Sequence, residues 1–341
     1  MGVGNVRRGR MIGNISAAAD FLGPGAIETN RYQSEIFDLV RRRGVLGQRI
    51  NQTPATGQPS RYFEETQINA ATSTDPRVIV PVASQPQRIE QVVSLKALVS
   101  QLNYSIFDVE VNQQQGQFAY LEAKDLTDAV DSVLKLHDQQ LWTGNDTNLI
   151  IPTTLNYFGI SGQIAQAPFL NPLGGTAVPP GFTQNVQVTA SGSLIDALKT
   201  QVAGMVSRTD FEVKPSAFYA SPVFLDLFDR EAKTFQLYYN ETEIQPGVIV
   251  KAIPTQAGLL PLVPEPFIPI LSVYPSSPQR QYEGFILSEE FIEYHWLTSP
   301  VPRVFQLGLL GNLAAQFVIL KFGAVVAKGA SYAHSHYFTV R

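Results

Sequence analysis

The stretch that most constrains the fold is residues 64–91, EETQINAATSTDPRVIVPVASQPQRIEQ, because it has almost no core of its own. Its one compact apolar run is residues 78–82, and Gln, Thr, Ser, Asn and Pro surround that run. Prolines at 76, 81 and 86 exclude an amphipathic helix. The pattern predicts a ribbon of two extended arms with residues 84–86 as the turn. A two-stranded ribbon is marginally stable alone, so this one needs a partner outside itself.

The composition indicates that an unusual share of the surface is covered by something other than water. The chain has 341 residues, of which 44% are apolar and only 16% are charged, whereas a typical soluble domain has roughly 25% charged residues. A net charge of −4 gives no global field that favours nucleic acid or an anionic membrane. Cysteine is absent, which excludes disulfides, thiolate catalysis and cysteine-ligated metals.

Segments that target a chain to a membrane are not recognisable. The N-terminal region has Asp20 inside its apolar stretch, unlike a signal peptide, and Val6 stands where myristoylation needs Ser or Thr. Residues 307–327 are apolar but are interrupted by Asn312, Gln316 and Lys321, so their apolar runs are too short to span a bilayer. We expect a soluble protein without a membrane partner.

Three segments have the spacing of amphipathic helices. The longest covers about residues 120–143 and stops at Gly144; at 1.5 Å per residue it is roughly 36 Å long, the length of a strut. The second lies within residues 191–208, and the third begins at Ser221-Pro222, with serine as N-cap. The predicted faces are Leu126, Val130, Val133, Leu134, His137 and Leu141; Leu194, Ile195, Leu198, Val202, Met205 and Val206; and Val223, Phe224, Leu227 and Phe228.

Extended segments and loops account for most of the remainder. We expect residues 1–44 to form an arm, and the loop-rich residues 147–190 to form a linker or an inserted surface loop. Strands are predicted at 92–102 (with a turn), 104–111, 216–220, 248–250, 252–253 and 316–326, the last with Gly323 as a candidate bulge. The prolines within residues 259–269 indicate an irregular connector there. Residues 284–287 and 291–297 are expected to form the two arms of a hairpin.

Patterns that carry catalytic or phosphate-binding chemistry are missing from the sequence. It contains no Walker loop, no strand–GxGxxG–helix unit and no G-x-S-x-G elbow. His334 and His336 are at most half of a metal site, so a polar strand end is the favoured interpretation. His137 is interpreted as an interior residue, and His295 as part of the hairpin.

Clusters of charge in the sequence have ordinary structural interpretations. Glu64-Glu65 and Glu289-Glu290 are adjacent pairs that point to opposite faces of a strand, so they are predicted as solvated positions rather than as an acid–base dyad. Arg41-Arg42-Arg43 favours local ion pairing or an inner surface over phosphate binding, because the chain is acidic overall.

The order of these segments resembles the major capsid proteins of tailed phages, of the Hong Kong 97 type. The resemblance covers essentially the whole chain, least so residues 147–190, and lies in segment order and degenerate patterns rather than in a rigid motif. It rests on RIEQVVSLKALVSQLNYSIFDVEV (88–111), LWTGND (141–146), IDALKTQVAGMV (195–206), PSAFYASPVFLDLF (215–228) and QFVILKFGAVV (316–326).

The resemblance implies an α+β Hong Kong 97-like fold with its family's division of the chain. The expected parts are an N-terminal arm (1–44), an extended β-hairpin loop (45–98), a peripheral domain with a spine helix (99–189), an axial domain (190–283) and C-terminal strands that return to both domains (284–341). The extended loop lies over a neighbouring subunit in this family. Our candidates for its intersubunit ion pairs are Arg61, Glu64, Glu65, Arg77 and Arg88.

The resemblance also implies partners and a location. Many copies form hexamers and pentamers of an icosahedral head, assembled in the host cytoplasm, which contacts packaged double-stranded DNA non-specifically and carries a portal. Some members weld the loop to a neighbour through a lysine–asparagine bond, but residues 44–91 contain no lysine, so we expect noncovalent contacts or a cement protein. The short arm leaves no room for a cleaved scaffolding domain, and the initial Met1 favours a separate scaffold protein over a processed chain.

Alternatives from other classes stay open. An encapsulin-type nanocompartment has the same fold with an enzyme as cargo. An enzyme with an unrecognised site and a phage tail or glycan-binding β-protein are less favoured, because no catalytic constellation emerges and three helices are predicted. We therefore expect no catalysis, no cofactor and no metal.

Overall fold

The computed structural model describes residues 43–67, 71, 73, 85–105, 118–147, 149, 151, 153–165, 185–208, 212–234, 239–245, 248–272, 279–310, 314–330 and 333–341. The chain divides into two units, Met1–Arg41 and Arg42–Arg341, and every described residue belongs to the second. The predicted N-terminal arm therefore lies outside the described residues, apart from Arg43 and Gly44.

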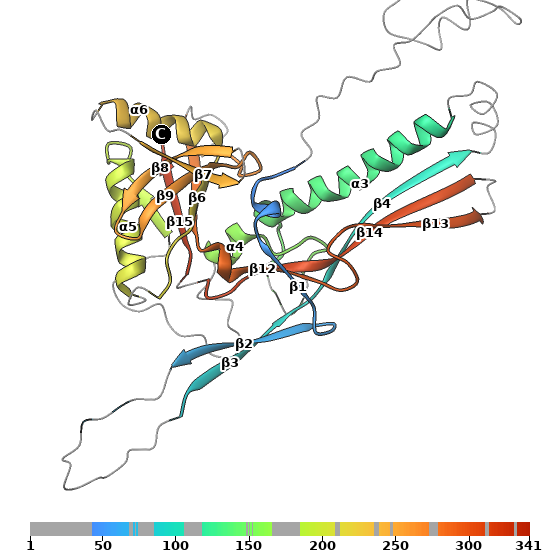
Figure 1. Ribbon diagram of the computed structural model, residues 1–341, viewed down its shortest axis with the longest axis horizontal. Coiled ribbons are helices and arrows are strands. Elements are labelled where there is room, and N and C mark those ends of the chain that lie inside the picture. The colour runs from blue at the N-terminus through green and yellow to red at the C-terminus, as the bar shows by residue number, and fades with distance from the viewer. Residues whose placement is uncertain are drawn as a thin grey trace, which may run out of the picture. The chain divides into compact units, whose positions relative to one another are not determined.

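A five-stranded sheet forms the first part of this unit, and the long helix α3 (Phe118–Thr143) packs on it (Figure 1). Its central strand, β14, pairs with β4 along one edge and with β12 and β13 in succession along the other, and β1 runs parallel to β12. The strands are β1 (Asn51–Pro54), β4 (Lys96–Ser105), β12 (Ile292–Trp296), β13 (Arg303–Leu310) and β14 (Ala314–Ala327).

Helix α3 confirms the predicted strut. Val133, His137 and Leu141 of its predicted face are buried. The helix ends before Gly144, where a Cβ atom would lie 2.4 Å from the carbonyl oxygen of Tyr157, so only glycine fits the turn.

An eight-stranded sheet forms the second part, in the order β5-β15-β11-β6-β9-β8-β7 with β10 added to β11. Two helices pack on it, α5 (Leu194–Arg208) and α6 (Pro222–Thr234), and all six predicted apolar residues of α5 are buried. The strands are β5 (Asn185–Val188), β6 (Ala217–Ala220), β7 (Asn240–Gln245), β8 (Val248–Thr255), β9 (Gly258–Pro264), β10 (Leu271–Ser272), β11 (Arg280–Leu287) and β15 (Ser335–Val340).

Side-chain caps start both helices of the second part. The hydroxyl of Ser221 accepts a hydrogen bond from the amide of Phe224, as predicted for α6. At α5 the hydroxyl of Ser193 accepts from the amide of Asp196, while the carboxylate of Glu231 accepts from the amides of Leu194 and Ile195. The second cap comes from α6, so it ties the two helices together.

A third, two-stranded sheet consists of β2 (Ser60–Gln67) and β3 (Gln87–Val93), so a ribbon forms as predicted, but not between the two arms predicted on either side of residues 84–86 (Figure 1). The partner of β3 is a strand upstream of the predicted arm at 78–82. That arm, and Ser84 of the predicted turn, lie outside the described residues. The remaining described elements are the helix α4 (Ile160–Ala165) and the short 3-10 turns η1 (Leu46–Gln48) and η3 (Glu289–Phe291).

The structure corrects several local predictions. Residues 284–297 do not form a hairpin: β11 belongs to the larger sheet and β12 to the smaller, and η3 carries the chain between them. Residues 258–264 form an inner strand rather than an irregular connector. Residues 92–102 do not form one strand, because β3 ends at Val93, β4 begins at Lys96, and Ser94 and Leu95 lie between them. The loop-rich residues 147–190 contain α4 and the whole of β5.

Three single-residue predictions are also wrong. Val223 is 49% exposed and does not belong to the buried face of α6. Gly323 makes no bulge; a Cβ atom there would lie 2.3 Å from the ring of Tyr294, which crosses over it. Glu289 is not solvated, because Arg49 binds both its carboxylate oxygens and Tyr219 donates a hydrogen bond to it.

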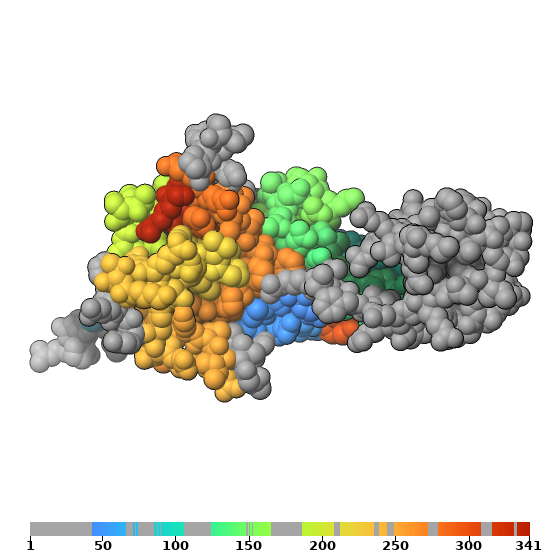
Figure 2. Space-filling model, turned by 90° about the horizontal axis from the view of Figure 1, so that it is seen from above, coloured from blue at the N-terminus to red at the C-terminus, as the bar shows by residue number. Residues whose placement is uncertain are grey.

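Two buried carboxylates hold the beginning of the described chain. Asp138 of α3 accepts from the Gly44 amide at 2.7 Å and from Arg43, so Arg43 makes the predicted local ion pair. Glu265, directly after β9, accepts from the amides of Val45 and Leu46 at 2.8 and 3.1 Å. In Figure 2 the blue residues near the start of the described chain lie beside orange residues from much later in the sequence. Residues 43–46 thus connect α3 to the end of β9 in the larger sheet.

We predict that Glu265→Gln melts at a higher temperature than the wild type at pH 7. Burial raises the pKa of the Glu265 carboxyl, and the nearby charge of Asp138 adds to the rise although the Leu46, Val45 and Phe267 amides oppose it. A raised carboxyl pKa makes the folded state bind its proton more tightly, so this group's contribution to stability falls as pH rises through the folded-state pKa. The amide of glutamine keeps an oxygen for the Val45 and Leu46 amides and removes the buried charge.

Thermal melts at several pH values test this prediction, with Glu265→Ala as the matched control. Alanine leaves the amides of Val45, Leu46 and Phe267 without this acceptor, at about 1–3 kcal/mol for each buried amide, so it should melt well below the wild type. If glutamine lowers the melting temperature as much as alanine does, the carboxylate charge itself stabilises the segment and our account of it is wrong.

Candidate assembly surface

The ribbon is fastened to the body through one of its two faces. Ser60, Tyr62 and Glu64 alternate along β2 and turn towards the body. The Ser60 hydroxyl lies 2.9 Å from Nδ1 of His295, and the Glu64 carboxylate accepts from the Gly329 amide at 3.0 Å. Tyr62 stacks edge-on against His295, with 6.0 Å between ring centroids. The side chains of this inner face therefore find their hydrogen-bond and packing partners within the same chain.

Ser60, His295 and Glu293 line up like a hydrolase triad but lie in the wrong environment for one. Nδ1 of His295 faces Ser60, and Nε2 lies 3.1 Å from the carboxylate of Glu293. Ser60 is 1% exposed and His295 4%, so a substrate cannot reach the hydroxyl. Burial lowers the pKa of His295 although Glu293 opposes the shift. The trio fastens β2 to β12, and sequence spacing gave no signal for it because Ser60 and His295 are far apart along the chain.

The outer face of the ribbon carries three of the five predicted contact residues. Arg61 pairs with Glu90 at 2.9 Å, and Arg88 pairs with Glu65 at 3.0 Å, across the two strands. Glu64 lies on the inner face instead, and Arg77 lies outside the described residues. Contact of these side chains with a neighbouring copy stays a prediction. Sequence reasoning overlooked Phe63, which stands between the two pairs and is 70% exposed.

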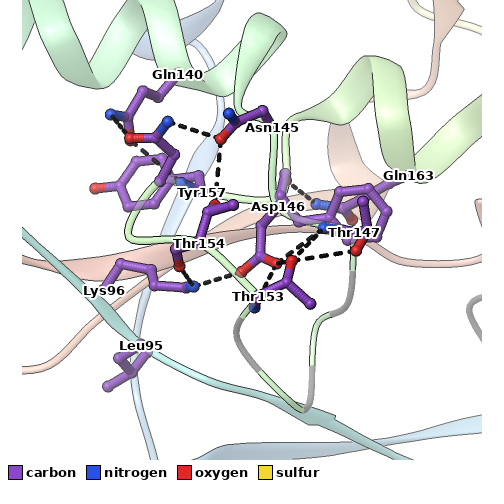
Figure 3. Close-up of polar contacts among 12 residues, drawn as sticks. Leu95, Lys96, Gln140, Asn145, Asp146, Thr147, Thr153, Thr154, Tyr157 and Gln163 are labelled. Atoms are coloured by element: carbon purple, nitrogen blue, oxygen red, sulfur yellow. Dashed lines mark hydrogen bonds and ion pairs between the residues drawn. The ribbon is translucent and has the colours of Figure 1, made fainter.

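A buried ion pair, shown in Figure 3, fixes the place where the ribbon joins the body. Lys96 begins β4, with two residues between it and the end of β3, and its ammonium group binds the carboxylate of Asp146 and the carbonyl oxygen of Thr154. The Lys96 side chain is 9% exposed and that of Asp146 is fully buried. Oδ1 of Asp146 accepts three further hydrogen bonds, from the amides of Thr147 and Thr153 and from the Thr153 hydroxyl.

These bonds make Asp146 a strongly held anion. Burial alone raises the pKa of its carboxyl, but the bonds from Lys96 and Thr153 and the amide of Thr147 more than offset burial and lower the pKa to about 2. A carboxylate with several donors and a lysine is expected to behave in this way. The lowered pKa keeps the group ionised at neutral pH and well into the acid range.

Through Asp146, the loop that follows α3 is bound to the base of the ribbon, where the chain passes from β3 to β4. The Ser94 amide donates to the carbonyl oxygen of Leu149. The side-chain oxygen of Asn145 accepts from the Thr154 hydroxyl (Figure 3) and from the Asn156 side chain, which closes the loop on itself. The Leu149 side chain packs with Tyr62 and Val93 on the small cluster of Ala324 and Val326. The arrangement fixes the base of the ribbon, because Lys96 of β4 and Asp146 of the loop form one buried charge pair and Ser94, between β3 and β4, bonds to the same loop.

The histidines near the C-terminus do not converge on a third ligand. Within the described ranges, no group of three or more His, Cys, Asp or Glu side chains is placed to hold a metal ion. His336 stacks between Phe285 and Phe338, with 4.9 and 5.2 Å between ring centroids, and burial lowers its pKa to about 4. His137 is buried, as predicted, beside Tyr157 and Tyr294.

In the part of the chain that the structure describes, none of the helices is both long enough and apolar enough to cross a membrane.

Comparison with known proteins identifies the fold. No protein-family model matches the chain, and no curated protein does. Solved structures match it over nearly its whole length. A capsid subunit of cyanophage A-1(L) aligns with a TM-score of 0.62 and 11% identity, covering 93% of this chain and 97% of that one. A Gordonia phage Cozz chain aligns with 0.55 and 11%, covering 95% and 92%.

An encapsulin is among the similar structures as well. The SrpI encapsulin of Synechococcus elongatus aligns with a TM-score of 0.51 and 13% identity, covering 96% of this chain and 95% of that one. At such low sequence identity, matches over nearly the full length of both chains show the fold of this protein. The chain has the α+β Hong Kong 97-like fold of tailed-phage capsid proteins, which the order of its segments had predicted.

Proposed function

We propose that this protein is the major capsid protein of a tailed double-stranded DNA phage and that it assembles into the icosahedral shell around the genome. The observation that carries the proposal is the ribbon. Its inner face is tied to its own chain, and its outer face exposes Phe63. An exposed aromatic side chain on a coreless ribbon is stabilised when a neighbouring copy covers it.

The proposal assigns a role to each part of the chain. The five-stranded sheet with α3 is the peripheral domain, and the eight-stranded sheet with α5 and α6 is the axial domain that meets its copies in hexamers and pentamers. The N-terminal arm reaches a neighbour. A separate scaffold protein, a cement or decoration protein and the portal complete the virion, where the protein resides. The shell is structural and has no catalytic role.

An encapsulin shell is the second candidate, and the similarity to the cyanobacterial encapsulin supports it. The two candidates differ in cargo. A phage shell encloses DNA, and its gene neighbours encode terminase and portal, whereas an encapsulin encloses an enzyme encoded beside it. Particle contents after nuclease treatment separate the two: protected DNA supports the phage shell, and a co-purifying enzyme supports the encapsulin.

Sedimentation velocity of the protein, expressed alone and with its candidate scaffold, tests the shell function. We expect a megadalton species or discrete rings of five or six copies. The shells should fall apart to single chains in hot SDS, because residues 44–91 contain no lysine for a loop cross-link. A stable monomer or dimer under both conditions would refute the shell function.

A further inference from the structure

The first described residues of the chain pass between two buried carboxyl groups. Asp138 of α3 is 1% exposed and Glu265 is fully buried. A Cβ atom at Gly44 would lie 3.1 Å from Oε1 of Glu265 and 3.3 Å from Cβ of Asp138. A Cβ atom at Gly47 would lie 2.1 Å from Oδ1 of Asp138. The two glycines therefore allow the backbone to pass close to both carboxyl groups. We call residues 43–47 the strap.

Backbone amides bind the strap to this carboxyl pair. The Gly44 amide donates to Oδ2 of Asp138 at 2.7 Å. The amides of Val45 and Leu46 donate to Oε2 of Glu265 at 2.8 and 3.1 Å. Oδ1 of Asp138 is buried and has no hydrogen-bond partner among the described residues. An ionised Asp138 therefore keeps one oxygen in the interior without a donor, and burying a charge without such partners is unfavourable.

Two cations lie near the pair. Arg43 of the strap binds Asp138 at 3.1 Å, and its side chain is 38% exposed. Lys321 of β14 is buried, with its ammonium group 4.6 Å from the ring centroid of Tyr294, and it makes no ion pair with a carboxylate of the described residues. The other titratable or charged groups around the pair are His137, Tyr157, Tyr294, Tyr219, Arg49 and Glu289.

The surroundings favour the protonated form of both carboxyl groups. Burial raises the pKa of Asp138, although the Gly44 amide and the two cations oppose the rise. Burial also raises the pKa of Glu265, and the charge of Asp138 adds to that rise, although backbone amides oppose it. Burial lowers the pKa of His137 well below 6.5, so this imidazole is neutral at neutral pH.

The carboxyl pair and Lys321 act in different pH ranges. The stabilisation from the raised pKa values is fully present below 3.8 for Asp138 and 4.5 for Glu265, and it is lost as the pH rises through the folded-state values. Burial lowers the pKa of Lys321 to about 8, so its contribution is present above 10.5 and is lost as the pH falls through about 8. A change between pH 5 and 7.5 therefore reports on the carboxyl pair.

We propose that the strap is a proton-controlled latch, which is closed between Asp138 and Glu265 while the pair holds a proton and opens locally when both groups are ionised. Two like charges held close together in the interior repel each other and drive the opening. Arg49, which binds both carboxylate oxygens of Glu289, holds the chain directly after the strap, so the opening ends there.

The latch sets the length of the connection to the N-terminal segment. The two units of the chain divide between Arg41 and Arg42, directly before the strap. Opening releases the strap's five residues from the body, and an extended chain spans up to about 3.3–3.6 Å per residue, so the connection lengthens by up to roughly 17 Å. The latch is a property of the single chain and does not depend on the shell function.

Hydrogen–deuterium exchange of the dilute full chain tests the latch. Exchange of amides 44–46 is measured at pH 5 and 7.5 and is corrected for the intrinsic rate at each pH. Each unit by which a carboxyl pKa is raised corresponds to a tenfold change in equilibrium, so we expect the protection of these amides to fall several-fold at pH 7.5. The matched control is the amides of Thr147 and Thr153, which donate to Asp146, a carboxylate that stays ionised over this range. Their protection should not change.

A charge-neutral variant shows whether the carboxyl pair drives the opening. Glu265→Gln keeps an oxygen for the Val45 and Leu46 amides without a charge, so its strap should lose clearly less protection at pH 7.5 than that of the wild type. Equal losses in the two proteins would overturn the latch, as would wild-type protection that does not change with pH. Loss of protection at Thr147 and Thr153 together with the strap would show unfolding of the body instead of local opening, which also overturns the latch.

Discussion

Replacing residues 64–91 by a short glycine–serine linker is expected to leave a folded body that forms no closed shells. Ser60, Tyr62 and Val93, which hold the ribbon's root, stay in place, as does the Lys96–Asp146 pair. The excised part contributes to the described body chiefly the bond from the Gly329 amide to Glu64, and one hydrogen bond is worth about 1 kcal/mol. The variant keeps Phe63 but loses the two ion pairs beside it, Arg61–Glu90 and Arg88–Glu65, together with the rest of the ribbon.

Circular dichroism and thermal melts measure the body, and light scattering measures assembly. The control is Arg88→Gln, which breaks one exposed ion pair worth about 0–1 kcal/mol and should still assemble. An unfolded deletion variant would show that the ribbon is part of the core, and a deletion variant that still forms closed shells would show that assembly does not use it.

Asp146→Ala is expected to be the most destabilising single change at the ribbon's root. It leaves the buried Lys96 ammonium without its carboxylate and three donors of Thr147 and Thr153 without their acceptor. Removing one partner of a buried ion pair costs about 3–5 kcal/mol. Denaturant unfolding of the unassembled protein measures the change.

A double-mutant cycle with Lys96→Met separates the pair from its surroundings. Methionine fills the space of the lysine stem without a charge, so Lys96→Met with Asp146→Asn should lose less stability than the sum of the single changes. If Asp146→Ala unfolds at the same denaturant concentration as the wild type, the buried pair does not hold the loop.

The same pair predicts a response to acid. The pKa of Asp146 is lowered from 3.8 to about 2, so its stabilisation is fully present above pH 3.8 and is lost as the pH falls through about 2. The shift corresponds to about 2 kcal/mol. The wild type should lose this amount between these pH values, and Asp146→Asn should not; equal acid sensitivity of the two proteins would contradict the assignment.

Local signals were enough to predict the helices and part of the ribbon. The faces of α3 and α5 follow from apolar spacing, and Ser221-Pro222 marks the start of α6, because caps and faces are properties of contiguous residues. The ribbon followed from its lack of a core. Val223 was wrongly assigned to the buried face of α6, because the apolar residues of a single helical turn do not define where that face ends.

Pairing between distant strands could not be predicted from local signals. β11 and β12 look like a hairpin because they are adjacent in sequence, yet each finds its partners in a different sheet. The prolines at 261 and 264 argued against β9, but burying Leu260, Leu262 and Val263 contributes about 1.5–3 kcal/mol each, more than the about 1 kcal/mol of a hydrogen bond that a proline forgoes.

The candidate surface was only half visible in the sequence. Arg61, Glu65 and Arg88 were found by their charge, whereas Phe63 was overlooked because one aromatic residue in a polar stretch carries no pattern. The turn with Asp146 was recognised from its resemblance to capsid proteins. Its partner Lys96 stands 50 residues away in sequence, and only the fold brings the two together.

Negative-stain electron microscopy of the purified protein, expressed with and without a scaffold, tests the central claim most directly. Our account predicts closed polyhedral particles, or rings of five or six subunits, in at least one of the two preparations. A uniform field of single small particles in both would contradict the claim that this chain builds a shell.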